Sequence, residues 1–236
     1  ARLLAAAGRR AAGAPLQYAT GRAAFRHLVL DVDERVLIPR PETELLVDFA
    51  LAGLAPGGIA IDVGTGSGCL ALALASEGRF ERVIATDISS DALAVARANA
   101  SNVAPALRCP VELRQGSLLG PVARERARLV VSNPPYIASG EAASLPRSVR
   151  DWEPALALYS GNEGMAHIAR LVTEAATVLE PRGRLAMEVD ARRASLATEL
   201  VAADGRYEAI EVRLDLTGRE RFVLARRRAS EDDGDA

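Results

Sequence analysis

Residues 61–68 read Ile-Asp-Val-Gly-Thr-Gly-Ser-Gly, an apolar run that ends in three alternating glycines. Glycine at every second position leaves the backbone of a tight turn without side chains, so a ligand can lie directly against it. A helical pattern follows at residues 69–75. A strand, a bare turn and a helix in this order predict a ligand site beyond the carboxyl end of a strand in a parallel sheet.

The same alternation of strand and helix continues along most of the chain. Helices are expected at residues 41–54, 69–75, 92–100, 163–179 and 191–203. Strands are expected at residues 59–63, 82–86, 111–113, 129–132, 184–188, 209–214 and 221–225. We therefore predict a doubly wound α/β fold with a mostly parallel seven-stranded sheet. The last two strands are close enough in sequence to pair as an antiparallel C-terminal hairpin.

Composition indicates one main domain. The 236 residues are 49% apolar and 25% charged, with a net charge of −2, which suits one sizeable core rather than two full domains. A short N-terminal extension is expected, with a remnant helix or linker at residues 1–14 and a strand and helix segment at residues 15–56 that packs on the main domain. Within that segment, residues 27–36 suggest a short strand and turn. The main domain then covers residues 57–228, and residues 229–236 form an acidic tail that we expect to be disordered.

Residue types that are scarce exclude several kinds of chemistry. All 29 basic residues are arginines, so a P-loop lysine, a Schiff-base lysine and a lysine general base are excluded. The two histidines and two cysteines do not have the spacing of a zinc site, and we expect no metal. Two isolated cysteines suit a reducing compartment, and no apolar run approaches the length that spans a membrane. A soluble cytoplasmic protein is therefore expected.

A second signal for a ligand lies at the end of the next expected strand. Asp87 follows the glycine turn at about the interval of the acid that accepts hydrogen bonds from a ribose diol. The glycine spacing differs from the dinucleotide fingerprint, which places a pyrophosphate at a helix N-terminus, so a nucleoside cofactor such as S-adenosylmethionine fits better. The residues expected to bind it are Gly64, Thr65, Gly66, Ser67, Gly68 and Asp87, with Ile88 over one face of the adenine. The plainer alternative is a tight turn, with Asp87 as the cap of the next helix.

A third signal follows the expected strand at residues 129–132. Here the chain continues with Asn133, Pro134, Pro135 and Tyr136. Two prolines stiffen the backbone, and they leave the Pro134 carbonyl and the Asn133 side-chain oxygen as fixed acceptors beyond the sheet edge. Two acceptors in a plane match the two hydrogens of a planar NH2 group. The alternative is a rigid turn with Tyr136 as an aromatic residue at its rim.

The chemistry of an amide or aromatic amine explains such acceptors. Its nitrogen is a poor nucleophile because the lone pair is delocalised, so the nitrogen has to be positioned rather than deprotonated. Acceptors for both hydrogens hold the nitrogen with its lone pair toward a sulfonium methyl group, and they bind more strongly as positive charge develops. Tyr136 can stack on the flat group and face the cationic methyl. Asn133, Pro134, Pro135 and Tyr136 are therefore the expected catalytic and substrate-binding residues, and Asn133 also borders the cofactor.

The flanking sequence resembles one family in particular. Residues 39–44 read Pro-Arg-Pro-Glu-Thr-Glu, residues 153–156 read Glu-Pro-Ala-Leu, and residues 215–221 read Asp-Leu-Thr-Gly-Arg-Glu-Arg. Together with the glycine turn and the Asn-Pro-Pro-Tyr sequence, they resemble the HemK/PrmC family of glutamine N5-methyltransferases across residues 15–228. The resemblance implies a Rossmann-like fold that uses S-adenosylmethionine, and a peptide-chain release factor as the partner.

This resemblance also implies roles for individual residues. The family methylates the side-chain amide of the glutamine in the Gly-Gly-Gln loop of release factors. The segment from Arg40 to Thr43 would pack over the mouth of the cofactor and substrate sites, with Arg40 and Pro41 as substrate-binding residues. Arg40 could instead be a solvated residue at a helix start. The chain has Gly116, Ser117 and Leu118 where the family often has an acid before the fourth strand, so Ser117 and Leu118 are the expected contacts to the adenine.

The chain departs from the family pattern at two further places. The family usually has an N-terminal helical bundle that helps to grip the release factor, and this sequence begins at about the end of that bundle. Glu188, Val189 and Asp190 stand where the family commonly has a glycine-containing end of the fifth strand, and the sequence suggests no interpretation of this change.

Two other functions compete with release-factor methylation. A nucleic-acid adenine N6-methyltransferase faces the same geometric problem, but the net acidic chain and the lack of an evident target-recognition insert make nucleic acid an unlikely substrate. A non-catalytic scaffold that binds a nucleoside would leave the acceptors at Asn133 and Pro134 without a role.

Overall fold

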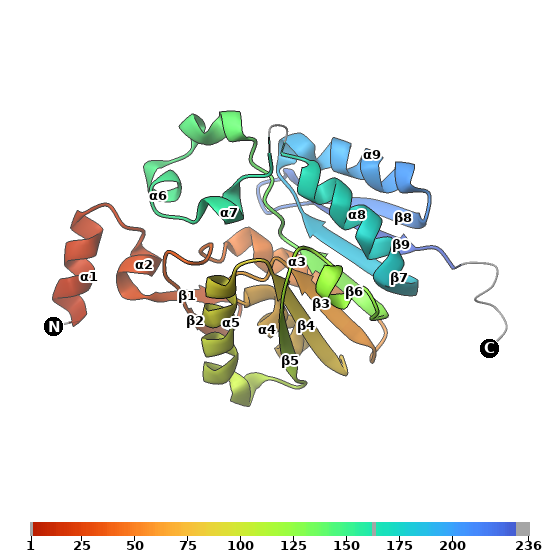
Figure 1. Ribbon diagram of the computed structural model, residues 1–236, viewed down its shortest axis with the longest axis horizontal. Helices are drawn as coiled ribbons and strands as arrows, with labels where there is room; N and C mark the ends of the chain where they lie inside the picture. Colours follow the sequence, from red (N-terminus) through yellow and green to blue (C-terminus); the bar gives the residue numbers. More distant parts are fainter. Residues whose placement is uncertain (1, 162–163, 230–236) are drawn as a thin grey trace.

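The computed structural model describes residues 2–161 and 164–229, and within these ranges its central feature is a seven-stranded sheet (Figure 1). The strand order is β5-β4-β3-β6-β7-β9-β8. Neighbouring strands from β5 to β7 are parallel, whereas β9 is antiparallel to both β7 and β8. The strand bounds are β3 Ile59–Val63, β4 Arg82–Asp87, β5 Val111–Gln115, β6 Ala127–Ser132, β7 Leu179–Glu188, β8 Tyr207–Leu214 and β9 Glu220–Arg227. The predicted fold class and the C-terminal hairpin are confirmed.

Helices cover both faces of this sheet. Alternate residues of one strand point to opposite faces, so Leu129 and Val131 join one apolar core while Val130 joins the other. The first core lies under α3 and α4, and the second lies under α8 and α9. The bounds are α3 Pro41–Leu51, α4 Cys69–Glu77, α5 Ser90–Asn102, α8 Ala166–Val178 and α9 Ala194–Asp204. None of the helices in the described ranges is long and apolar enough to cross a membrane.

The N-terminal part of the chain forms a helix, a short helix and a separate hairpin. Helix α1 covers Arg2–Ala11, helix α2 covers Leu16–Thr20, and β1 (Arg22–Phe25) pairs antiparallel with β2 (Leu28–Asp31). The expected strand within residues 27–36 is therefore only four residues long. Its partner β1 was not predicted, because the sequence Arg-Ala-Ala-Phe carries little strand propensity. Phe25, Leu28 and Leu30 nevertheless enter the same core as α3 and α4.

An unpredicted segment leaves the sheet after β6. It contains the 3-10 helix η3 (Ser139–Ser144) and helices α6 (Arg147–Arg150) and α7 (Ala155–Leu158). Figure 1 shows α6 and α7 outside the layers of the sheet. The segment is closed at its base, because the Ile137 N–H donates to the Leu158 carbonyl at 3.0 Å and the Ser160 N–H donates to the Ile137 carbonyl at 2.9 Å. It stands beyond the carboxyl ends of the parallel strands.

Smaller differences concern element ends. Strand β7 begins at Leu179 rather than at residue 184, because Leu179 pairs with Ala127 before a shift in register. Three further 3-10 helices are short connections, namely η1 Ala104–Ala106, η2 Gly120–Val122 and η4 Ala191–Arg193. From residue 230 onward, the expected acidic tail lies outside the described residues.

Candidate active site

The glycine turn at residues 64–68 connects β3 to α4, as predicted. Gly64, Gly66 and Gly68 have φ angles of 74°, 55° and 85°, a region that favours glycine. The N–H groups of Gly64 and Thr65 both donate to the carbonyl of Thr86 on β4, at 2.9 and 3.0 Å. These hydrogen bonds hold the turn against the neighbouring strand, so its position depends on backbone atoms of two adjacent strands.

A buried carboxylate supports this turn from below. Asp62, on β3, is fully buried, and its Oδ2 accepts hydrogen bonds from the Thr65 hydroxyl at 2.6 Å and from the Ala71 N–H at 3.1 Å. Burial raises the pKa of Asp62 to about 7, although both hydrogen bonds act in the opposite direction. Thr65 therefore serves the internal structure of the turn. This role of Asp62 was not predicted, although an acidic residue near the end of a buried strand is a sequence feature that points to it.

Asp87 ends β4 and faces the glycine turn. Its Oδ2 accepts from the Gly66 N–H at 2.9 Å, and its Oδ1 accepts from the Ser89 N–H at 2.9 Å. A carboxylate offers about four acceptor positions, so both oxygens keep capacity for a ligand. The cap of α5 is Ser89, whose hydroxyl accepts from the Ala92 N–H at 3.1 Å, rather than Asp87. Ile88 is 54% exposed beside this carboxylate.

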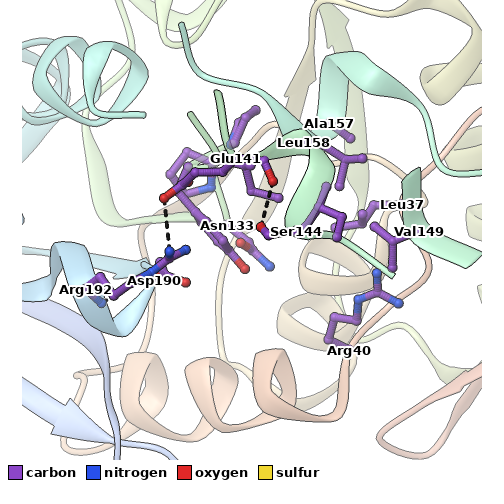
Figure 2. Close-up of a pocket in the computed structure, with 15 residues that line it drawn as sticks. Leu37, Arg40, Asn133, Glu141, Ser144, Val149, Ala157, Leu158, Asp190 and Arg192 are labelled. Atoms are coloured by element: carbon purple, nitrogen blue, oxygen red, sulfur yellow. Dashed lines mark hydrogen bonds and ion pairs between the residues drawn. The ribbon is translucent and has the colours of Figure 1, made fainter. Parts of the chain in front are cut away.

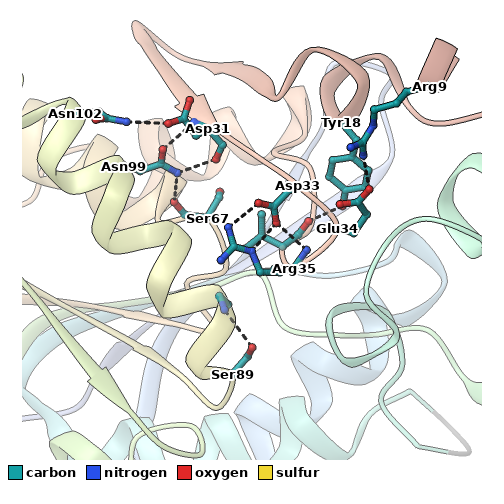
Figure 3. Close-up of polar contacts among 12 residues, drawn as sticks. Arg9, Tyr18, Asp31, Asp33, Glu34, Arg35, Ser67, Ser89, Asn99 and Asn102 are labelled. Atoms are coloured by element: carbon teal, nitrogen blue, oxygen red, sulfur yellow. Dashed lines mark hydrogen bonds and ion pairs between the residues drawn. The ribbon is translucent and has the colours of Figure 1, made fainter. Parts of the chain in front are cut away.

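An asparagine links the turn to the N-terminal hairpin (Figure 3). Asn99, on α5, is fully buried, and its Nδ2 donates to the carbonyls of Ser67 at 2.9 Å and Asp31 at 3.0 Å. Its Oδ1 accepts from the Asp31 N–H at 2.7 Å. The loop that follows β2 is thereby held beside the glycine turn, and its residues 34–37 form one wall of the adjoining cavity. Sequence patterns gave no signal for Asn99.

A cavity of about 380 Å³ opens in front of the turn. Nine of the predicted site residues line it, namely Gly64, Gly66, Asp87, Ile88, Ser117, Leu118, Asn133, Pro134 and Pro135. Thr65, Ser67 and Gly68 do not line it, because they form the inner side of the turn. His167 also lines the cavity, and its Nδ1 lies 2.7 Å from the hydroxyl of buried Ser160. Burial lowers the pKa of His167, which favours the neutral ring.

The strand that leads to Asn133 lies next to the strand that leads to the glycine turn. Ser132 on β6 pairs with Val63 on β3, and the Ser132 hydroxyl also donates to the Val63 carbonyl at 2.7 Å. Asn133 and Gly64 therefore leave the sheet side by side. The Asn133 Nδ2 donates to the Thr43 hydroxyl at 3.1 Å, so the other end of the amide, Oδ1, is directed away from Thr43. Sequence analysis did not identify Thr43 as a partner of Asn133.

A smaller cavity of about 240 Å³ lies on the other side of Asn133. In Figure 2 Asn133 stands at the centre of the labelled residues, with Asp190 and Arg192 on one side and Arg40 on the other. Pro134 and Pro135 belong to the wall that the two cavities share, and Tyr136 lines the smaller cavity alone. Burial, followed by the nearby charge of Glu188, raises the pKa of Tyr136 to about 12, so its phenol is neutral at physiological pH. The larger and smaller cavities have Leu37, Asn133, Pro134, Pro135 and Ala157 in common.

Arg40 lies at the rim of the smaller cavity and is not freely solvated. Its Nη2 contacts both carboxylate oxygens of Glu153, at 2.6 and 2.8 Å, and the Glu153 side chain is 1% exposed. Burial raises the pKa of Glu153, while the Arg40 guanidinium counteracts the shift. Pro41 begins α3 and lines neither cavity. Thus Arg40 attaches the segment after β6 to the start of α3, and Pro41 fixes the helix start.

Comparison with known proteins identifies a family and several relatives of this chain. Residues 25–146 match the family model of the methyltransferase small domain. The release factor glutamine methyltransferase of Deinococcus radiodurans is 45% identical over 222 residues, which cover 93% of this chain and 77% of that protein. The enzyme of the same name from Nitratidesulfovibrio vulgaris is 41% identical over 229 residues, which cover 93% of this chain and 75% of that protein.

Solved structures support the same fold. A methyltransferase from Pyrococcus furiosus superimposes with a TM-score of 0.65 at 19% identity, covering 88% of this chain and 92% of that one. The E. cuniculi Mtq2-Trm112 complex, described as responsible for methylation of the translation termination factor eRF1, gives a TM-score of 0.54 at 22% identity, covering 83% of this chain and 99% of that one. At these identities the structures establish the fold alone, whereas the curated relatives are similar enough to establish descent. The chain belongs to the family of release factor glutamine methyltransferases.

Proposed function

We propose that the protein transfers a methyl group from S-adenosylmethionine to the side-chain amide nitrogen, N5, of the glutamine in the Gly-Gly-Gln loop of a peptide-chain release factor. The position of the Asn133 amide is the main support for this reaction. The Asn133 amide stands in the wall between a cavity beside the glycine turn and a second cavity that opens outward, with its nitrogen already bonded to Thr43. Its oxygen is therefore the free end, which suits a substrate that offers N–H donors. The names of the relatives support the substrate class.

The larger cavity fits S-adenosylmethionine. An added Cβ at Gly64 or Gly66 would meet no atom within 4 Å, so the space in front of the turn is open. Asp87 keeps acceptor capacity for the two ribose hydroxyls, and Ile88 offers an exposed apolar surface for the adenine. Ser117 and Leu118 line the same cavity beyond Asp87 and would contact the base. The cofactor supplies an electrophilic methyl group on a sulfonium, and the protein's part is to bind and orient.

The acceptors beyond β6 would do most of the catalytic work. Asn133 Oδ1 and the Pro134 carbonyl would each accept one hydrogen of the glutamine NH2 group, which directs the nitrogen lone pair toward the larger cavity. Both acceptors bind more strongly as the nitrogen gains positive charge during transfer. Tyr136, neutral at physiological pH, would stack on the flat amide. As the new N–C bond would form, the methyl–sulfur bond would break and leave S-adenosylhomocysteine as the product. The nitrogen would then lose one proton to water, so no strong base is needed.

The surroundings of the smaller cavity argue against a nucleic-acid substrate. Its charged lining is mixed, with Arg40 and Arg192 opposed by Glu141 and Asp190. Arg40 is paired with Glu153, and Arg192 is paired with Asp190 at 2.7 Å. A site that binds a phosphate backbone needs unpaired positive charge instead. A protein loop is therefore the better occupant. A release factor as the substrate supports a cytoplasmic location.

We further propose that residues 57–228 form the methyltransferase domain, with residues 15–56 as an integral wall of its site rather than a separate domain. Phe25, Leu28 and Leu30 share an apolar core with α3 and α4, and residues 34–37 line the cofactor cavity. Residues 1–14 would act as an extension beside this wall. Deletion of residues 1–14 should leave S-adenosylmethionine binding intact, whereas deletion of residues 1–36 should abolish it.

A direct assay tests the proposed reaction. The protein is incubated with S-adenosylmethionine that carries a labelled methyl group, and with a release factor, a release factor whose Gly-Gly-Gln glutamine is changed to alanine, or double-stranded DNA. We expect label only on the unmodified release factor, and mass spectrometry of its digest should locate one methyl group on that glutamine. Label on DNA alone, or equal label on the alanine variant, would refute the proposal.

A further inference from the structure

Asn133 stands at the end of a chain of three polar side chains that come from distant parts of the sequence. Its Nδ2 donates to the Thr43 hydroxyl at 3.1 Å, and the Thr43 hydroxyl donates to Glu188 Oε2 at 2.6 Å. Thr43 is 2% exposed and Glu188 is 1% exposed. Glu188 ends β7, Thr43 lies in the first turn of α3, and Asn133 follows β6. The chain of hydrogen bonds therefore connects three elements directly behind the acceptor site.

The number of protons in this chain determines the direction of each hydrogen bond. An ionised carboxylate only accepts, so the single hydroxyl proton of Thr43 is committed to Glu188. The Thr43 oxygen then has only lone pairs to offer to Asn133. Of the two ends of the Asn133 amide, only the NH2 group donates, so this end must face Thr43. The amide oxygen is consequently left on the opposite side.

We infer that Glu188 is a positioning residue that, through Thr43, fixes the polarity of the Asn133 amide, so that Asn133 presents an acceptor rather than a donor to the substrate. The inference rests on the proposed function, because a glutamine NH2 group can be bound only by acceptors. With the Asn133 amide reversed, its NH2 group would meet the NH2 group of the substrate. Two donors cannot form a hydrogen bond, and the acceptor site would be lost.

Protonation of Glu188 would release this constraint. A neutral carboxyl group can donate its own proton to Thr43, which frees the Thr43 proton to bind the oxygen of Asn133 instead. Burial raises the pKa of Glu188 to about 7, and the hydrogen bond from Thr43 only partly offsets this shift. Activity should therefore decline as the pH falls through about 7, because the ionised form holds the acceptor in place.

The charges around Glu188 come from four neighbouring elements. Arg221 on β9 and Arg40 before α3 lower its pKa, while Glu42 on α3 raises it. Both arginines have carboxylate partners of their own, since Arg40 binds Glu153 at 2.6 Å and Arg221 lies 3.5 Å from Asp215. Two further ionisable groups interact electrostatically with this carboxylate, namely the Tyr136 phenol after β6 and the Cys69 thiol at the start of α4. Both have raised pKa values and are neutral near pH 7.

A purely structural role explains this arrangement less well. A carboxylate with so little exposure destabilises the fold in its charged form, and a neutral amide or apolar side chain would avoid that penalty. The ionised carboxylate of Glu188 is unfavourable for folding near neutral pH but favourable for the orientation of Asn133. This is the pattern expected of a residue that serves the site.

Three variants and one pH series test the inference. Thr43→Val keeps the shape of the side chain but removes the hydroxyl, and we expect kcat to fall about 30-fold, the effect of one lost orienting hydrogen bond, with the Kd for S-adenosylmethionine within twofold. Thr43→Ser keeps the hydroxyl and should stay within about threefold of wild type in kcat. Equal loss in Thr43→Ser and Thr43→Val, or full activity in Thr43→Val, would overturn the inference.

The pH series separates Glu188 from other groups. In single turnovers at saturating S-adenosylmethionine, the wild-type rate should rise about tenfold from pH 6 to pH 8, because each unit below the pKa lowers the ionised fraction up to tenfold. Glu188→Gln keeps an acceptor oxygen but cannot titrate, so its rate should vary less than twofold over this range. Burial also raises the pKa of Asp62 to about 7. A pH response that persists in Glu188→Gln would therefore show that another group, such as Asp62, causes it, and would refute the inference.

A measurement without turnover distinguishes this inference from the proposed reaction. The side-chain NH2 signals of Asn133 in an NMR spectrum, assigned by their loss in Asn133→Ala, should shift with pH around a midpoint near 7 in the wild-type protein and stay constant in Glu188→Gln. If the signals titrate but no release factor is methylated, the proposed function fails while the positioning role stands. If the signals do not titrate, the positioning role fails, whatever the activity.

Discussion

The two halves of the site are held together in different ways. In the cofactor half, formed by the glycine turn and Asp87, the turn is held by side-chain hydrogen bonds between residues that are close in sequence: Thr65 to Asp62, three residues apart, and Gly66 to Asp87, twenty-one residues apart. One longer contact, from Asn99 to Asp31 at a separation of 68 residues, holds the wall at residues 34–37. In the acceptor half, around Asn133, the corresponding contacts join Thr43 to Glu188 and Asn133 to Thr43, at separations of 145 and 90 residues. The glycine turn therefore depends mainly on neighbouring elements, whereas the acceptor half depends on elements from almost the whole chain.

This difference separates binding from catalysis. Changes near the glycine turn should affect the affinity for S-adenosylmethionine, because the proposed role of that half is to bind the cofactor. Changes around Asn133 should affect the rate, because the proposed role of that half is to hold the substrate nitrogen in a geometry that matters most in the transition state. Four substitutions test whether this division holds.

The largest effect is expected for Asn133→Ala. Loss of an acceptor that strengthens during transfer should lower kcat about 1000-fold, similar to the loss of an oxyanion-hole donor. The Kd for S-adenosylmethionine, measured by calorimetry, should change no more than about threefold. Asn102→Ala, which removes an exposed asparagine bonded to Asp31, is the matched control and should leave both quantities unchanged. If Asn133→Ala lowered the affinity for S-adenosylmethionine as much as the rate, the separation of cofactor binding from catalysis would be wrong.

Asp87→Ala should produce the opposite pattern. The carboxylate accepts from Gly66 and would accept from the ribose. Its removal should raise the Kd for S-adenosylmethionine about 100-fold, which corresponds to the free energy of a hydrogen bond to a charged group. At saturating cofactor, kcat should stay within about threefold. Asp48→Ala removes a half-exposed carboxylate that pairs with Arg26 and should not alter the Kd. An unchanged Kd in Asp87→Ala would contradict the ribose contact.

Arg40→Met tests how far the acceptor half depends on distant contacts. The change leaves buried Glu153 without its partner, and the free energy of unfolding should fall by about 2 kcal/mol at pH 8. The pKa of Glu153 is already raised in the folded protein, so the folded state binds its proton more tightly and stability decreases as the pH rises through that pKa. Removal of Arg40 should steepen this decrease and be nearly harmless at pH 4.5.

Urea titrations at both pH values measure the effect of Arg40→Met. The double variant Arg40→Met, Glu153→Gln removes the unpaired charge and should recover more than half of the lost stability at pH 8. A loss that is equal at both pH values would show that packing, and not the ion pair, attaches this segment.

The smallest effect is expected for Gly66→Ala. A positive φ of 55° strains an alanine by about 1 kcal/mol, and the new methyl group points into open space on the cavity side. We expect a rise of about tenfold in the Kd for S-adenosylmethionine, with kcat little changed. Gly21→Ala is a matched control, since Gly21 has a φ of 75° and open surroundings but lies outside both cavities. Equal loss of affinity in both variants would show that Gly66→Ala acts by destabilising the fold and not by occupying the cavity.

The sequence predicted the parts of the molecule that local patterns encode. Strand and helix periodicity located the strands of the main sheet, and the alternating glycines located the turn beside Asp87. The Asn-Pro-Pro-Tyr sequence located the wall between the two cavities, because prolines after a buried strand restrict the backbone wherever the rest of the chain lies. The glycine turn and Asp87 were therefore predictable, whereas the cavity wall at residues 34–37 was not.

Side-chain partners from distant segments were not predictable in this way. Glu188 stands in a departure from the family pattern and Thr43 lies within a family motif, but periodicity does not reveal that the Thr43 hydroxyl and Glu188 Oε2 lie 2.6 Å apart. Asn99 read as one of many polar helix residues, although it is fully buried between Ser67 and Asp31. The segment with α6 and α7 was missed because its helices are only four residues long.

The antiparallel course of β9 has a practical consequence. Because β9 runs against β7, its last residues pair near the beginning of β7, as Arg226 does with Arg184, at the edge of the sheet opposite to Asn133. Any polypeptide attached after residue 229 therefore starts at the far side of the molecule (Figure 1). A short surface tether that replaces residues 230–236 would attach the enzyme at the end of the sheet opposite to both cavities.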